Sequence, residues 1–160
     1  MQRATGTKYS YRRRLPHVQR DDKPLFVTFA TFGHAPLGST ARYLMLRHCL
    51  HGHGKKYLLH AAVIMPEHVH LLLSPLRNAA GDVFPLQQIL QSIKGAAAHS
   101  INKASGRQGP VWEEESFDHV LRSYESLEEK LEYIRQNPVR RRLVRRPEDY
   151  RWLWVAPRII

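Results

Sequence analysis

The chain has 160 residues, 42% of them hydrophobic and 24% charged, so its length and composition fit one folded domain and argue against disorder. Its single cysteine, Cys49, excludes an intrachain disulfide and a cysteine-rich zinc module, and no apolar run reaches the roughly 18 residues of a membrane helix. The formal net charge of +11 favours a polyanionic partner, and without a visible secretory signal we expect a reducing compartment and no membrane.

Hydrophobic spacing predicts strands and helices in alternation along the chain. In chain order we expect a strand over 25–32, a helix over 39–50, strands over 57–65 and 68–74, a helix over 85–103, a strand over 111–121 and a helix over 126–136. Pro138 is expected to end the last helix, because proline lacks the backbone donor and clashes with the preceding turn.

The order of these elements predicts an α+β fold: a ferredoxin-like sandwich, with a mostly antiparallel sheet and helices packed on it. Only two residues separate the strands over 57–65 and 68–74, which indicates a hairpin. We divide the chain into a basic N-terminal arm (1–24), a central domain (25–144) and a basic C-terminal tail (145–160).

The positive charge is concentrated at the two ends of the chain. Residues 1–24 carry +5 and residues 135–160 carry +6, whereas residues 25–134 hold ten basic and ten acidic side chains. The C-terminal basic residues are all arginines, whose planar guanidinium can bind two phosphate oxygens at once. Nucleic acid is therefore the leading partner, although short basic runs are also common as solvated tails.

Two histidines share one face of the third predicted strand. His68 and His70 alternate with apolar residues, so both imidazoles project to the same side. Such a pair can bind one divalent metal ion. Alone it is a weak signal, because two histidines on a half-exposed strand are common.

Tyr133 and Asn137 are four residues apart near the end of the last predicted helix, so they lie on one face. Asn137 offers an amide oxygen as a third ligand, and a hydroxyl beside a metal is a potential nucleophile. Taken alone, Tyr133 is better explained as a core aromatic and Asn137 as a helix-end residue before proline. Their occurrence together with His68 and His70 favours a site.

Four stretches, in this order, resemble those of the single-tyrosine HUH transposases of bacterial insertion sequences, most closely the REP-associated tyrosine transposases. They are RRRLPH at 12–17, MPEHVHLL at 65–72, GPVWEEESFD at 109–118 and YIRQNPV at 133–139. The second is similar to the family's HUH strand, with Val69 as the hydrophobic U, and the fourth to its tyrosine helix. The resemblance spans about residues 12–154 and implies that 25–144 is an HUH catalytic domain.

The resemblance implies an endonuclease and strand transferase that cuts single-stranded DNA beside a hairpin, using Mg²⁺ or Mn²⁺. By position, Tyr133 is the nucleophile that becomes joined to the 5′ phosphate, and the metal ligands are His68, His70 and Asn137. The implied location is the bacterial cytoplasm, at the nucleoid, and relatives include monomers and homodimers. The arginines expected to contact DNA are Arg12, Arg13, Arg14, Arg135, Arg140, Arg141 and Arg142.

Two non-catalytic functions also fit the charge pattern. One is a domesticated relative that binds a DNA hairpin without cutting it, and a weaker one is an RNA-binding protein of similar fold. The joint presence of the four stretches favours the cutting enzyme.

Some residues have competing interpretations. Tyr124 is a rival nucleophile, ranked below Tyr133 because no asparagine follows it by four residues. Trp112 and Phe117 are candidates for stacking on DNA bases and equally good core residues. Arg141 and its neighbour Arg142 stand where relatives commonly have a small residue and glycine. We expect that His48, His51 and His53 form no second metal site with Cys49, and that Tyr150, Trp152 and Trp154 dock the tail. Glu67 is a candidate for a position near the metal, but a carboxylate in a turn is more often solvated.

Overall fold

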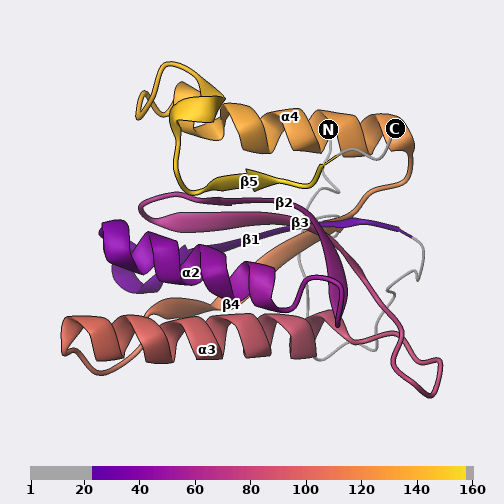
Figure 1. Cartoon of the computed structure of the whole chain (residues 1–160), viewed down its shortest axis with the longest axis horizontal. Coiled ribbons are helices and arrows are strands. Elements are labelled where there is room, and N and C mark those ends of the chain that lie inside the picture. The colour runs from indigo at the N-terminus through magenta and orange to yellow at the C-terminus, as the bar shows by residue number, and fades with distance from the viewer. Residues whose placement is uncertain (1–22, 158–160) are drawn as a thin grey trace, which may run out of the picture.

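The computed structural model describes residues 23–157, in which a five-stranded sheet lies between helices on its two faces (Figure 1). The elements are β1 (Leu25–Thr31), α2 (Ser39–His51), β2 (Tyr57–Ile64), β3 (His68–Pro75), α3 (Leu86–Ser105), β4 (Trp112–Val120), α4 (Tyr124–Arg140) and β5 (Leu153–Val155), with short 3-10 helices at Phe32–His34 and Pro147–Asp149. The first seven helices and strands agree with the predicted order.

The sheet has the strand order β4-β1-β3-β2-β5, and every neighbouring pair is antiparallel. β1 and β3 are neighbours inside the sheet, whereas β4 and β5 are its edges. The predicted hairpin joins β2 to β3. The expected α+β, ferredoxin-like sandwich is therefore confirmed.

The two faces of the sheet bury different side chains because successive residues of a strand point to opposite sides. Leu25, Val27 and Phe29 of β1 belong to the larger core, which α2 and α3 cover. Phe26 packs on the opposite side, against a smaller cluster that includes Ile134 of α4. Figure 1 shows α4 alone on that second face, above the sheet, with α2 and α3 below it.

α4 extends beyond its predicted end. The helix continues through Pro138 to Arg140, so the expectation that Pro138 would stop it is wrong. Proline removes one donor but leaves its own carbonyl and those before it free to accept. The Arg141 backbone amide donates to the Asn137 carbonyl at 3.0 Å, which carries the helical pattern past the proline.

β5 is an element that the sequence did not predict, because it is only three residues long. It pairs with the edge of β2 and brings part of the predicted tail into the sheet. Just before it, the Tyr150 hydroxyl donates to the Ile64 carbonyl at 2.7 Å. The Arg42 guanidinium lies 3.9 Å from the centroid of the Trp152 ring. The expected docking of the tail by its aromatic residues is confirmed.

The described part of the chain, residues 23–157, has no helix with the length and hydrophobicity needed to span a bilayer.

Asp118 is an unusual group in β4. It pairs in register with Val27, and within residues 23–157 its Oδ1 is buried without a hydrogen-bond partner. Burial raises the pKa of Asp118 from its usual 3.8 to about 6. Between these two values the folded state holds a proton that the unfolded state has lost, so the free energy of unfolding falls as the pH rises through this window.

We therefore expect Asp118→Asn to be more stable than the wild type at pH 7, by about 1–2 kcal/mol. The gain should shrink as the pH falls towards 4, because Asp118 is then protonated in the folded state and only partly ionised in the unfolded state. Urea unfolding of both proteins at pH 4 and pH 7 measures the difference. An equal difference at the two pH values would contradict the burial effect.

Candidate active site at the centre of the sheet

His70 lies in the middle of the sheet on the face that α4 covers. It pairs in register with Thr28 of β1, and the Thr28 Oγ1 and His70 Nδ1 atoms are hydrogen-bonded at 2.8 Å. The side chain is 5% exposed, and among residues 23–157 nothing bonds its Nε2. A buried polar atom without a partner is rare in native proteins, and a metal ion is one of the few things that explain it.

His68 stands two residues earlier on the same face, as predicted. Its ring centroid is 4.7 Å from that of His70. The turn before it is held in place, because the Thr31 backbone amide and hydroxyl both donate to the Glu67 carbonyl, at 2.8 and 3.2 Å. The Met65 amide also donates to the His68 carbonyl at 2.8 Å. These hydrogen bonds to backbone carbonyls fix the position of the backbone that carries the His68 side chain.

The surroundings of both imidazoles favour the neutral form, because each pKa lies below its usual value of 6.5. Burial, together with the neighbouring His68, Arg140 and Lys130, lowers the pKa of His70 to about 3. Burial also lowers the pKa of His68, with Arg141 adding to the effect. A neutral imidazole has a free lone pair, which is the form that binds a metal ion.

Tyr133 lies on α4 above the two histidines. Its ring is edge-on to His70, with the centroids 5.7 Å apart at 80°, and equally edge-on to Phe26 at 5.7 Å and 86°. The side chain is 40% exposed, so a ligand can approach it from solvent. Asn137, one helical turn further on, is 5% exposed. The structure therefore brings the predicted tyrosine to the predicted histidines, with the asparagine on the same helix.

Two cations flank the tyrosine ring. The Arg140 guanidinium lies 4.4 Å from the ring centroid of Tyr133, and the Lys130 ammonium lies 5.4 Å from it. Arg140 also donates to the Tyr133 carbonyl at 3.1 Å. An exposed tyrosine whose ring lies beside two cations and the His70 imidazole has the groups needed to bind a phosphate diester.

The chain shares its fold with a REP-associated tyrosine transposase. That protein, whose structure was solved bound to a REP hairpin, aligns over 88% of this chain and 81% of its own, with a TM-score of 0.68 and 21% sequence identity. A weaker match is a candidate transposase of Deinococcus radiodurans R1, with a TM-score of 0.47 and 18% identity over 78% of this chain and 95% of that one. No protein-family model and no curated protein sequence matches the chain.

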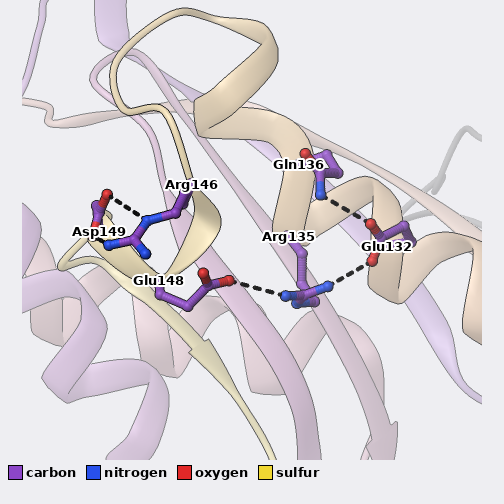
Figure 2. A network of polar contacts seen from close by, with 6 residues as sticks. All are labelled: Glu132, Arg135, Gln136, Arg146, Glu148 and Asp149. Carbon is purple, nitrogen blue, oxygen red and sulfur yellow. Dashed lines mark hydrogen bonds and ion pairs between the residues drawn. The ribbon is translucent and has the colours of Figure 1, made fainter.

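The predicted DNA-binding arginines have different surroundings. Arg135 is ion-paired with Glu132 at 2.8 Å and with Glu148 at 3.3 Å, and Figure 2 shows it between these two carboxylates. Arg141 is paired with Glu67 at 2.9 Å, so that carboxylate is not simply solvated as expected. Arg142 is exposed just after α4. Arg12, Arg13 and Arg14 lie outside the described residues.

The polar network continues beyond Arg135. As Figure 2 shows, Gln136 donates to Glu132 at 3.0 Å, and Arg146 bonds Asp149 at 3.1 and 3.3 Å. These groups are exposed, so each contact contributes little to stability. They do matter for the positive charge that a ligand would meet. The charge of Arg135 is already paired with two carboxylates, whereas the guanidinium of Arg140 lies against the ring of Tyr133.

A second metal site is not found in the part of the chain that the structure describes. Residues 23–157 contain no cluster of three or more His, Cys, Asp or Glu side chains placed to hold a metal ion. His48 bonds the Ser100 hydroxyl, and His53 accepts from the Leu59 amide. Cys49 is fully buried, which raises the pKa of its thiol to about 12.

Three residues of the site were not identified from the sequence. Thr28 bonds His70, Phe26 stacks on it with ring centroids 5.6 Å apart, and Lys130 flanks Tyr133. The alternation of strand residues places Phe26 and Thr28 on one face. Alternation alone does not say that β3, which carries His70, lies beside β1. The role of Phe26 and Thr28 depends on that pairing.

Thr28→Val tests the contact that holds His70. It leaves both ring nitrogens of a buried imidazole without a partner, so we expect a loss of about 1–3 kcal/mol in the free energy of unfolding. Thr28→Ser is the matched control, since it keeps the hydroxyl. Valine favours strands more than serine does, so a more stable serine variant isolates the hydrogen bond. Equal stability of the two in urea unfolding would contradict it.

Proposed function

We propose that this protein is a REP-associated-type tyrosine transposase, which cuts and rejoins single-stranded DNA beside a hairpin using a divalent metal ion and a tyrosine nucleophile. The observation that carries the proposal is the unbonded, buried Nε2 of His70, next to His68 and under the exposed ring of Tyr133. The fold shared with a REP-hairpin-bound transposase supports it.

The residues fit a Mg²⁺ or Mn²⁺ ion. His70 has a neutral ring and a free Nε2, and its other nitrogen is already bonded to Thr28, the arrangement that orients metal-binding histidines. His68 supplies the second imidazole and Asn137 an amide oxygen. When bound, the metal ion would polarise the scissile phosphodiester and offset the charge that develops in the transition state.

The chain's own groups carry out the remaining steps. The Tyr133 oxygen attacks the phosphorus, the 3′ oxygen leaves and takes a proton, and the hydroxyl proton of Tyr133 passes to water. A phosphotyrosine linked to the 5′ end and a free 3′ hydroxyl result. Lys130 and Arg140, beside the ring, bind the non-bridging oxygens. Attack by another 3′ hydroxyl reverses the sequence, so rejoining needs no ATP.

Electrostatics support a DNA partner. The chain carries a net charge of +11. Arg135 is paired with carboxylates, but Arg140 and Lys130 place positive charge directly beside Tyr133. The hairpin bound by the structural neighbour is a property of that protein. For this chain we propose a hairpin with a single-stranded flank, in which the flank enters the site.

The nucleophile is tested by a covalent-adduct assay. Single-stranded hairpin DNA from the flanks of the protein's own gene is incubated with Mn²⁺ or with EDTA, and adducts are separated on a denaturing gel. We expect a metal-dependent adduct that Tyr133→Phe abolishes, because the ring and its contacts remain but the attacking oxygen is lost. Binding of the same DNA on a native gel should be nearly unchanged.

Tyr124→Phe is the matched control, since it removes the rival hydroxyl and should leave the adduct intact. A normal adduct yield in Tyr133→Phe would refute the assignment. Tight binding by the wild type with no adduct in any metal would instead support a hairpin-binding protein that does not cut.

A further inference from the structure

Phe117 is an exposed aromatic residue on a part of the sheet that α4 leaves open. α4 packs on β2 and β3, whereas β4 is the edge strand on the other side of β1. Phe117 lies in β4 and is 50% exposed. Within residues 23–157 no ring or cation is stacked on it. A single exposed aromatic is common on protein surfaces, so a role for Phe117 depends on its position in the sheet.

The position is defined by the register of three strands. Phe117 pairs with Thr28, and Thr28 pairs with His70. Directly paired residues of antiparallel strands project to the same face of a sheet. Phe117 therefore stands in one row with the histidine of the site, two strand spacings or about 10 Å away.

The other aromatic candidate in this strand is part of the core. Trp112 is 7% exposed and packs edge-on against Phe29, with the ring centroids 5.2 Å apart. Its position differs from that of Phe117 by an odd number of residues, so the two rings lie on opposite faces of the sheet. Of these two rings, Phe117 is the one that a ligand at the site can reach.

Charge around the row gives a direction to a bound strand. Lys130 lies 4.7 Å from the ring centroid of Phe26, at the α4 side of the row, and Arg140 lies beside Tyr133. Glu115, which is exposed and two residues before Phe117, is on the β4 side. The phosphates of a bound strand are attracted to the cations beside α4 and repelled by Glu115 on β4. The bases are therefore left over β4.

We infer that Phe117 is a stacking platform for a nucleobase of the single-stranded DNA whose backbone passes Tyr133. The inference rests on the proposed function in that the ligand is DNA. An aromatic ring stacks on any base, because every base has a π face. Stacking on Phe117 would hold a nucleotide a short distance from the cut and fix the path of the strand across the row.

The test is binding that requires no cleavage and no known target. The probes are an oligothymidine of about 12 nucleotides and an abasic chain of the same length, which share their phosphates and differ in the bases. We expect the wild type to prefer oligothymidine and Phe117→Ala to lose about tenfold in affinity for it, with little change for the abasic chain. Phe117→Trp should keep the preference.

Tyr43→Ala is the matched control. Tyr43 is 55% exposed on α2, on the opposite side of the sheet, so its removal should leave both affinities unchanged. Equal binding of the two probes by the wild type, or a preference that survives in Phe117→Ala, would overturn the inference. A changed oligomeric state of Phe117→Ala in light scattering would assign the ring to a contact between copies and would overturn it as well.

The two proposals fail separately. Oligothymidine binding does not depend on the Tyr133 hydroxyl, whereas the covalent adduct does. If the adduct forms but the wild type shows no preference for oligothymidine, only the stacking role of Phe117 is contradicted. If the preference is present but no adduct forms, only the cutting activity is contradicted.

Discussion

The hydrogen bond between Thr28 and His70 is the contact on which the site depends. It joins the two neighbouring strands inside the sheet at 2.8 Å and leaves the other ring nitrogen of a buried imidazole without a partner in the described chain. Burial also keeps that ring neutral. A neutral, oriented imidazole with one free nitrogen has the form that binds a metal ion, which supports the metal site that we propose. Coordination of a metal ion would give the buried Nε2 of His70 the partner that it lacks in the described chain.

The helix above the sheet completes the arrangement. Its apolar side, which includes Ile134, packs on β2 and β3 and fixes the rotation of the helix. That rotation places Tyr133 over His70 and leaves it 40% exposed, while Asn137 is buried one turn further on. The core on the far face, under α2 and α3, holds the sheet that supports both groups. One face of the sheet thus provides stability and the other provides the site.

Much of this could be predicted from the sequence because it depends on local periodicity. Alternation places His68 and His70 on one face, and helical spacing places Tyr133 and Asn137 on another. The order of elements also indicates the ferredoxin-like sandwich. The predicted helix end at Pro138 was wrong, because proline near a helix terminus removes a single bond and leaves the later donors in place.

The contribution of Thr28 and Phe117 depends on strand order and register, which no local pattern specifies. Alternation says that Trp112 and Phe117 face opposite sides, but only the pairing with β1 shows which side carries the site. The strand Leu153–Val155 was missed for the same reason: three residues carry too little pattern, and their pairing with β2 is a long-range event.

The proposed metal site is tested most directly by locating the ion itself. Crystals soaked in Mn²⁺ give an anomalous signal at the ion itself. We expect a peak coordinated by the Nε2 of His70, a ring nitrogen of His68 and the amide oxygen of Asn137. Manganese bound elsewhere, or a site at which His70 Nε2 contacts only water at saturating Mn²⁺, would contradict it.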